Sequence, residues 1–378
     1  MMQATPPKIA TRRYRVARKV RESEIITSFY LAPADGEALA PFRPGQFLTF
    51  QLQDPPRGGV VRRNYSLSGS ADWPEHYRIS VKREPASGAG HPPGLVSNHL
   101  HDSIEVGAEL EARGPDGRFV LDAGAARPVV LLSGGVGLTP LVAMAHALAR
   151  EGRRRTHFIH ACENGRAHAL SREMRQLSRT APNLHLHVCY RNPDASDELG
   201  RDYDSEGLIT PALLQALLPL DDYDFYLCGP GPFMQSVFTQ LVELGVREER
   251  IRYEFFGPAT LLRASPPLIK EAGALAPSAQ AASGLSAPAT ATTDALTVTF
   301  SRSGLSVAWD PSFETLLDFA EAQGLTPAFS CRAGICSTCM CDMPAGEVDY
   351  VADPLDEPPQ GKALLCCSRP RGDVVIAL

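Results

Sequence analysis

The chain has 378 residues, enough for two or three domains, and we expect three. A net charge of −6 gives no basic surface for nucleic acid, and the longest basic run, residues 153–155, is typical of a solvated loop. No segment has the apolar length that spans a bilayer, and the first residues lack the apolar core of a signal peptide. We therefore expect a cytoplasmic protein with neither a membrane nor a nucleic-acid partner.

Residues 14–121 alternate between apolar and polar side chains with a period of two. Leu48, Phe50 and Leu52 show the pattern, and a second example lies within residues 77–82. This period predicts half-buried strands, and the Pro/Gly turns between them favour a small antiparallel β-barrel.

One of these strands reads Arg63-Asn64-Tyr65-Ser66. Such a strand can place a guanidinium, an aromatic ring and a hydroxyl on one patch, where they would meet a phosphate, the isoalloxazine face and a polar edge of a flavin. Alone, it is equally typical of an ordinary strand. Downstream, Ser97 is predicted to cap a short helix whose N-terminus would attract phosphate.

Beyond residue 126 the pattern changes to apolar runs separated by helical segments, which predicts a parallel α/β sheet. The first run leads into Ser133-Gly134-Gly135-Val136-Gly137-Leu138-Thr139-Pro140 and a helix. Glycines let a backbone approach a pyrophosphate, the helix directs its positive end at it, and proline suits a first helical turn.

The choice between NADH and NADPH stays open in the sequence. We place the end of the second strand of this sheet within residues 160–165, and no acidic residue is expected after it at the position of the Rossmann ribose-binding acid. Arg166 and Arg172 could hold a 2′-phosphate, although arginines on a helix surface are commonly only solvated.

The cysteines near the C-terminal end carry the strongest signal. Cys331, Cys336 and Cys339 have the C-x4-C-x2-C spacing of a plant-type [2Fe-2S] loop, with a fourth ligand from Cys366 or Cys367. A zinc site or redox-active thiols are the alternatives, but zinc would not need the C-x4-C spacing. Nine cysteines without an export signal favour metal ligation and free thiols over disulfides.

Residues 264–294 are rich in Ala, Pro, Ser and Thr, which predicts a flexible linker with a reach of about 30 Å. The next segment alternates as in a strand and turns at Gly304. It then reads as a helix that begins at Asp310 and closes at Gly324. Hairpin, helix and cysteine loop follow each other in the β-grasp order.

Together these motifs resemble the ferredoxin:NADP reductase superfamily, most of all the reductase half of flavohaemoglobins, joined to a plant-type ferredoxin from about residue 296. Phthalate dioxygenase reductase has the same three-part order. The matching stretches are residues 44–47, 63–66, 81–84, 96–98, 135–140, 228–230 and 253–258. The longer loop at residues 85–93 departs from the flavohaemoglobin pattern. The resemblance implies FAD, with FMN as the alternative because phthalate dioxygenase reductase uses it, and NADH ahead of NADPH.

The resemblance also implies roles for individual residues. Ser66 would hydrogen-bond near the flavin N5, Cys228 would orient the nicotinamide C4, and Glu254 with Phe256 would shape that pocket. The fourth cluster ligand would be Cys366, four residues before a proline, with Cys367 facing away. The implied cofactor contacts are Phe47, Arg63, Asn64, Tyr65, Ser66, Val81, Lys82, Gly94, Val96, Ser97, Gly135, Val136, Gly137, Leu138, Thr139, Pro140, Cys228, Gly229, Phe255, Phe256, Gly257 and Pro258.

We thus expect a multidomain monomer with an antiparallel β-barrel flavin domain (8–124), an α/β parallel-sheet NAD(P) domain (125–262), a linker (263–293) and an α+β β-grasp [2Fe-2S] ferredoxin domain (294–378). It would pass electrons from NADH through FAD and the cluster to a partner such as a Rieske or di-iron oxygenase.

Other functions remain open at this stage. They are a redox sensor, a reductase of a haem or hybrid-cluster protein, and an NADH oxidase that detoxifies nitric oxide, against which the lack of a globin segment counts. Acidic residues are frequent between residues 342 and 357, where they would steer a basic partner or form a solvated loop.

Overall fold

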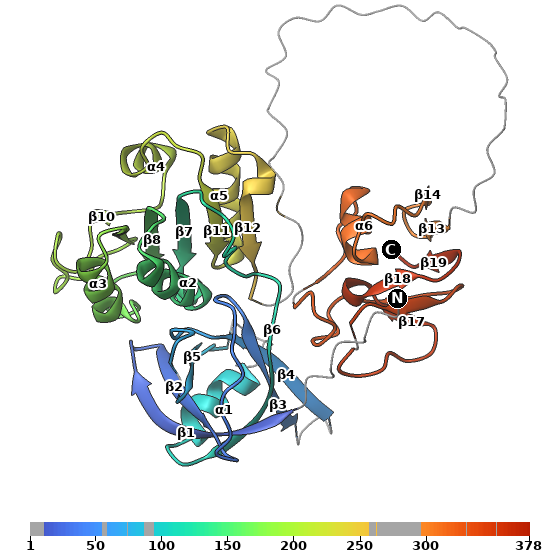
Figure 1. The fold of residues 1–378 in the computed structure, drawn as a ribbon, viewed down its shortest axis with the longest axis horizontal. Coiled ribbons are helices and arrows are strands. Elements are labelled where there is room, and N and C mark those ends of the chain that lie inside the picture. Colours follow the sequence, from blue (N-terminus) through green and yellow to red (C-terminus); the bar gives the residue numbers. More distant parts are fainter. Residues whose placement is uncertain are drawn as a thin grey trace, which may run out of the picture.

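The structure, a computed structural model, describes residues 11–54, 59–73, 75–86, 94–256, 262, 296–329, 331–352 and 354–378. The predicted linker, Gly257, Pro258 and residues 87–93 lie outside these residues. Figure 1 shows a barrel in blue and cyan beneath an α/β domain in green and yellow, with a smaller domain in orange and red beside them.

The first domain is a six-stranded antiparallel barrel with one helix. Its sheet order is β4-β3-β6-β1-β2-β5, and a bridge between Leu67 and Ile79 joins the two edges. Phe29, Leu48 and Ile79 are fully buried in its core. The elements are β1 (Arg12–Arg21), β2 (Ile26–Pro33), β3 (Phe47–Asp54), β4 (Gly59–Ser66), β5 (Tyr77–Lys82), α1 (Leu95–Ser103) and β6 (Glu109–Asp116).

The prediction of half-buried strands is wrong for β5. Arg78 and Ser80, expected to face solvent, are 1% and 3% exposed. Their face of β5 is covered because the α/β domain packs against it, and Arg78 pairs there with Glu173 of that domain. On β5 the period of two therefore distinguishes an apolar buried face from a polar buried face, and not a buried face from an exposed one.

The second domain contains a parallel sheet of order β10-β9-β8-β7-β11-β12. All four apolar runs predicted as strands are strands in it. Val130 and Val129, adjacent on β7, belong to separate cores on the two faces of the sheet, as expected for a parallel sheet covered by helices. The elements are β7 (Val129–Gly134), α2 (Leu138–Glu151), β8 (Thr156–Cys162), α3 (Ser171–Thr180), β9 (Leu184–Tyr190), β10 (Ser205–Glu206), α4 (Pro211–Leu217), β11 (Asp224–Cys228), α5 (Gly231–Glu243) and β12 (Ile251–Glu254), with 3-10 turns η1 (Gly135–Gly137) and η2 (Glu248–Arg250).

The third domain pairs β13 with β14 and β19, and contains two further two-stranded sheets, β15 with β17 and β16 with β18. Its helix begins at Leu316, not at Asp310 as predicted. Thr315 is the cap because its Oγ1 accepts from the Asp318 N–H at 3.2 Å, whereas Asp310 lies in a turn before it. The elements are β13 (Thr297–Phe300), β14 (Leu305–Ala308), α6 (Leu316–Ala322), β15 (Met340–Asp342), β16 (Val348–Tyr350), β17 (Lys362–Leu364), η3 (Leu365–Cys367), β18 (Ser368–Pro370) and β19 (Val374–Ile376).

Among the described residues, no helix has both the length and the apolar character needed to cross a membrane.

Candidate functional site

A cleft of about 410 Å³ lies where the three domains meet, which is a volume typical of cofactor sites. Its walls are formed by strand β4, the start of α1, the turn after β7, the end of β12 and the cysteine loop. Sixteen predicted residues line it: Phe47, Arg63, Asn64, Tyr65, Ser66, Lys82, Gly94, Val96, Ser97, Val136, Thr139, Glu254, Phe255, Phe256, Cys331 and Cys336. The sequence analysis missed five further lining residues: Arg62, Ser80, Glu84, Leu95 and Thr338.

Some predicted contacts lie behind the cleft. Val81 and Leu138 are buried in domain cores, at 0% and 1% exposure. Cys228 is fully buried beneath the cleft, and Gly137 packs against it. These buried residues pack behind the side chains that line the cleft and support them.

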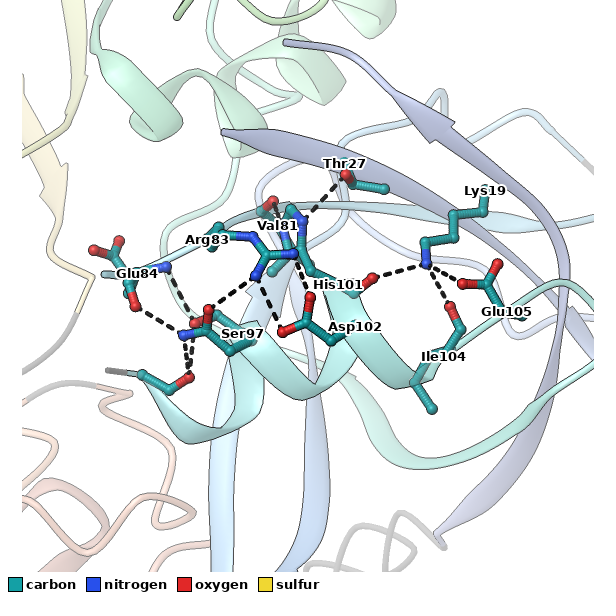
Figure 2. Close-up of polar contacts among 12 residues, drawn as sticks. Lys19, Thr27, Val81, Arg83, Glu84, Ser97, His101, Asp102, Ile104 and Glu105 are labelled. Atoms are coloured by element: carbon teal, nitrogen blue, oxygen red, sulfur yellow. Dashed lines mark hydrogen bonds and ion pairs between the residues drawn. The ribbon is translucent and has the colours of Figure 1, made fainter. Parts of the chain in front are cut away.

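The start of α1 differs from the prediction. The helix begins at Leu95 with Gly94 as its cap, so Ser97 is the third helical residue and not the N-cap. Its Oγ accepts from the Glu84 N–H at 3.3 Å and donates to the Gly94 carbonyl at 3.2 Å (Figure 2). A hydroxyl in the first turn ties the helix start to the strand end that faces the cleft.

Polar contacts hold the rest of α1 on the barrel (Figure 2). Arg83 donates to both carboxylate oxygens of Asp102, at 3.1 and 2.6 Å. Lys19 Nζ satisfies the free carbonyls of His101 and Ile104 at the helix end, at 2.9 and 2.8 Å. Burial lowers the pKa of His101, which keeps its ring neutral between barrel strands. These contacts hold the C-terminal end of the helix on the barrel, while the Ser97 contacts hold its start.

The glycines after β7 serve two purposes. Gly135 has φ +53° with open space around it, so the chain turns there without obstructing a ligand. At Gly137, by contrast, a Cβ would lie 2.2 Å from the Cys228 carbonyl oxygen. That glycine lets the turn after β7 pack closely against the turn after β11, and the pyrophosphate approach expected from the sequence stays a prediction. Pro140 is the third residue of α2, in the first turn as predicted.

Cys228 and Glu254 are register partners on β11 and β12, and Glu254 adjoins Ser66 in the lining of the cleft. Burial raises the pKa of Glu254 to about 8, and a hydrogen bond with Ser66 partly opposes the rise. Burial, with the nearby Glu254, also raises the pKa of the Cys228 thiol. Glu254 Oε2 is buried and has no hydrogen-bond partner among the described residues. The site thus holds a neutral thiol beside a carboxyl that can keep a proton at neutral pH.

The cysteine loop directs backbone N–H groups at sulfur, which is how proteins stabilise thiolate-bound clusters. The N–H groups of Ala333, Ile335 and Cys336 each lie 3.4 Å from Cys331 Sγ. The Gly334 N–H lies 3.3 Å from the Sγ of Cys366, the cysteine that the resemblance implies as the fourth ligand.

Cys367 also lies close to the loop. A Cβ at Gly334 would stand 2.8 Å from Cys367 Sγ, so this thiol supports the back of the loop. No three of the described His, Cys, Asp or Glu side chains converge closely enough to hold a single metal ion. A two-iron cluster needs its four thiolates spread over two metal centres.

The third domain reaches the cleft through this loop. Cys331 and Ile335 form a buried apolar cluster with Phe47 of the barrel. Arg62 pairs with Asp356, and Arg118 Nη2 lies 3.2 Å from Glu314 Oε2. Sequence reasoning missed these pairs because nothing local links a barrel arginine to an acid about 200 or more residues away.

The edge of the sheet beside the glycine turn carries an acid that the sequence analysis placed wrongly. β8 ends at Cys162, so Glu163 follows it directly, at the position of the Rossmann ribose-binding acid. Asn192 donates to Glu163. Arg166 Nε lies 2.9 Å from Asp194, and Arg172 is exposed on α3. Of the two arginines offered for a 2′-phosphate, Arg166 is thus already paired.

Most of the acids expected to steer a partner are paired within the chain. Asp342 pairs with Lys362 at 2.7 Å, and Asp349 with Arg371 at 2.7 Å. Asp356 pairs with the barrel, as described above. Asp353 lies outside the described residues.

Three family models match in the order of the domains. Residues 13–121 match the oxidoreductase FAD-binding domain, residues 131–239 the oxidoreductase NAD-binding domain, and residues 298–371 the 2Fe-2S iron-sulfur cluster binding domain.

Similarity to curated proteins covers the first two domains. The flavohemoprotein of Rhodopirellula baltica is 48% identical over 250 residues, which are 66% of this chain and 61% of that protein. The flavohemoprotein of Rhizobium meliloti is 45% identical over 247 residues, 65% of this chain and 60% of that protein. The chain spans about three fifths of the length of these relatives.

Solved structures extend the similarity to the whole chain. The flavohem-like FAD/NAD binding domain of nitric oxide dioxygenase from Vibrio cholerae is 38% identical, with a TM-score of 0.59, over 66% of this chain and 99% of that one. Phthalate dioxygenase reductase shares the fold over 98% of both chains, with a TM-score of 0.53 at 23% identity.

Proposed function

Because this chain belongs to the ferredoxin:NADP reductase superfamily, as a flavohaemoglobin-like FAD and NAD reductase module joined to a plant-type [2Fe-2S] ferredoxin domain, we propose that it carries electrons from NADH to a partner protein. The partner proposed is a terminal oxygenase of the Rieske or di-iron type, which the name and 98% coverage of phthalate dioxygenase reductase support. The observation that carries the proposal is the shared cleft, whose walls include flavin-domain residues and two of the cluster cysteines.

When bound, the flavin accepts two electrons together and releases them one at a time, which a one-electron cluster requires. The chain's own residues position the reactants. Tyr65 and Phe256 offer aromatic faces to the cleft, while the start of α1 offers backbone N–H groups to a phosphate. The four proposed ligands, Cys331, Cys336, Cys339 and Cys366, would hold the cluster, and two of them, Cys331 and Cys336, line the cleft.

Ser66 and Glu254 hold a proton between them in the lining of the cleft. With a pKa of about 8, Glu254 keeps its proton at neutral pH and can share it with the Ser66 hydroxyl. The buried Cys228 thiol stays neutral and limits how deeply the nicotinamide ring can sink. These groups orient the ring and exclude water.

Coenzyme choice follows from the acid after β8. Glu163 would accept hydrogen bonds from a ribose and repel a 2′-phosphate. Arg166, one of the two candidates to neutralise that phosphate, is paired with Asp194. We therefore propose NADH as the electron donor, with FAD as the flavin.

The test is sustained turnover with the purified holoprotein. NADH should drive many rounds of cytochrome c reduction per protein, and NADPH should be a poorer donor at equal concentration. A sensor would be reduced once and then stop. Reduction of the cluster without steady acceptor turnover would contradict the proposal.

The domain division is a proposal too, with boundaries at residues 124, 262 and 293. Cutting the chain within residues 274–291 should leave an N-terminal piece that binds flavin and reduces ferricyanide with NADH, and a C-terminal piece that holds the cluster. Mixed together, the pieces should reduce cytochrome c far more slowly than the intact chain, because the effective concentration set by covalent connection is lost. Precipitation of the N-terminal piece would show that the boundaries are wrong.

A further inference from the structure

The strand that ends in Glu254 lies between two domains. β12 is the last strand of the parallel sheet and pairs with β11, and Figure 1 shows it on the side of the α/β domain that faces the ferredoxin domain. The strand ends at Glu254, so Phe255 and Phe256 lie beyond its ladder. The positions of these two rings therefore depend on side-chain packing and not on strand pairing.

Phe255 packs against the cores of two domains at once. It contacts the apolar core on the α5 face of the parallel sheet, and it contacts the ferredoxin core that contains Phe319 and Cys339. Among the residues that the structure describes, no other belongs to both of these cores. Phe255 also lines the cleft, together with Glu254 and Phe256. One side chain thus joins the ferredoxin domain, the nicotinamide domain and the cleft.

Tyr253, the residue before Glu254, also lies near the ferredoxin domain. Its ring stands edge-on to the Phe255 ring, with 5.7 Å between the centroids. Burial raises the pKa of Tyr253, and the charges of Arg332 and Glu321 in the ferredoxin domain lie close enough to lower and raise it, respectively. Both neighbours of Glu254 in the chain are therefore close to the ferredoxin domain.

The ferredoxin domain is held in this position by contacts that can open. Arg118 of the barrel lies 3.2 Å from Glu314, and the two side chains are 41% and 69% exposed. Exposed pairs contribute little to stability and are screened by salt. If the ferredoxin domain moves away, Phe255 loses its packing on one of its two cores. A binding site whose wall has lost packing must be ordered again when a ligand binds, which lowers its affinity.

We infer that Phe255 is a positioning residue that couples docking of the ferredoxin domain to the affinity for nicotinamide nucleotide. The inference rests on the proposed function. With the ferredoxin domain docked, Phe255 is held between the two cores and keeps Glu254 and Phe256 in the arrangement that binds the nicotinamide ring. With the domain away, the site binds the nucleotide more weakly, so NAD⁺ leaves preferentially from the undocked protein. By thermodynamic linkage, bound NAD⁺ strengthens docking by the same factor.

The coupling can be measured in the oxidised full-length holoprotein, with NAD⁺ as the probe and isothermal titration calorimetry as the readout. Arg118→Glu places like charges opposite Glu314, so it weakens docking without altering the nicotinamide domain. Phe255→Ala removes the coupling side chain, whereas Phe255→Leu keeps an apolar contact. Arg15→Glu is the matched control for the charge reversal, because Arg15 pairs with Glu109 within the barrel.

Arg118→Glu should raise the dissociation constant for NAD⁺ by about fivefold, and Phe255→Ala should raise it at least as much. The double variant should bind NAD⁺ no more weakly than Phe255→Ala alone, because the side chain that responds to docking is already gone. Phe255→Leu should keep most of the dependence on Arg118, and Arg15→Glu should bind NAD⁺ like the unsubstituted protein. Flavin reduction at saturating NADH should keep its rate in Arg118→Glu, because docking changes the affinity and not the hydride transfer.

An unchanged NAD⁺ affinity in Arg118→Glu or in Phe255→Ala would overturn the coupling. Additive losses in the double variant would also overturn it, because Phe255 would then act within the nicotinamide domain alone. Since Arg118 lies outside that domain, its result decides the coupling even if Phe255→Ala fails to fold. Failure of the unsubstituted protein to bind NAD⁺, or of NADH to reduce its flavin, would instead overturn the proposed function and this inference with it. The other contrary results leave the proposed function standing, so the two failures are distinguishable.

Discussion

The chain contains two junctions between domains. One is held by a buried ion pair, and the other by exposed ion pairs around a small apolar contact. Between the barrel and the nicotinamide domain, Arg78 is 1% exposed and donates to both carboxylate oxygens of Glu173, one of them at 2.8 Å. His146 adds a contact to the same carboxylate at 2.7 Å. Between the barrel and the ferredoxin domain, the ion pairs are exposed and surround a small apolar contact.

This difference matches what each transfer needs. Hydride transfer requires the nicotinamide and flavin to be held within a few tenths of an ångström, which favours a fixed junction. In the proposed function, delivery of single electrons to an outside protein requires that the contact between the barrel and the ferredoxin domain can open. One junction is therefore buried and bidentate, and the other is exposed and screened by solvent.

Acid should weaken the fixed junction first at Glu173. Burial alone would raise the pKa of this carboxyl, but hydrogen bonds from His146 and Arg78 hold it at about 2. Because that pKa lies below the usual 4.5, the stabilisation is complete above about pH 4.5 and is lost as the pH falls toward 2.

The largest expected effect comes from breaking the fixed junction. Arg78→Met leaves Glu173 without its bidentate partner and should destabilise the reductase module by about 3 kcal/mol, since removing one member of a buried pair strands the other. Thermal unfolding of the holoprotein measures the loss. Arg118→Met at the other junction is the matched control and should cost less than about 1 kcal/mol. Equal losses of unfolding free energy in the two variants would show that the two junctions do not differ in strength.

A second prediction removes the cluster from the ferredoxin domain and leaves the junction between the barrel and the nicotinamide domain unchanged. Cys366→Ser should remove or strongly perturb the cluster, because Cys366 is the proposed fourth ligand and the Gly334 N–H is directed at its sulfur. Cys367→Ser and Cys341→Ser should keep the cluster's visible spectrum. All three variants should still reduce ferricyanide with NADH. Bleaching in Cys367→Ser instead would shift the fourth ligand by one residue.

The sequence predicted the elements well, because the period of two and the alternation of apolar runs with helices are local properties of the chain. The barrel, the parallel sheet and the order of the domains follow from them, and the family models confirm the three domains. Most lining residues of the cleft were also predicted, because the motifs at residues 63–66 and 133–140 are local and the family resemblance supplied the others.

The junctions could not be predicted in the same way. Arg78 stands at a position that alternation assigns to solvent, and only the packing of a second domain makes it buried. The pairs of Arg62 and Arg118 join segments about 200 or more residues apart. The misplaced helix start at Asp310 has a local cause, because both Asp310 and Thr315 are good caps and the choice is made by which turn packs on the domain core.

A third prediction sharpens the chemistry at the fixed junction. The rate of flavin reduction at saturating NADH should fall as the pH rises through about 8, because Glu254 then loses the proton it holds beside Ser66. The expected decrease is about tenfold. Stopped-flow measurements from pH 6 to 9.5 would show it. Glu254→Gln should flatten the profile, and Ser66→Ala should move the apparent pKa upward, since the Ser66 hydrogen bond lowers it. A profile that persists unchanged in Glu254→Gln would assign the titration to another group.

The smallest expected effect tests whether the second junction is held by exposed charge. Raising the ionic strength from about 0.05 to about 0.5 M shortens the screening length to a few ångströms, so the pairs of Arg118 and Arg62 weaken while the buried Arg78 pair does not. Electron transfer from flavin to cluster should slow by about two- to fivefold, with flavin reduction at saturating NADH unchanged. Stopped-flow absorbance separates the two steps, and sucrose in place of salt controls for viscosity and hydration. Arg118→Glu should already be slow at low salt and respond less to added salt, because part of the charge that salt would screen has gone. Equal salt sensitivity of hydride transfer and cluster reduction would mean that both junctions depend on exposed charge.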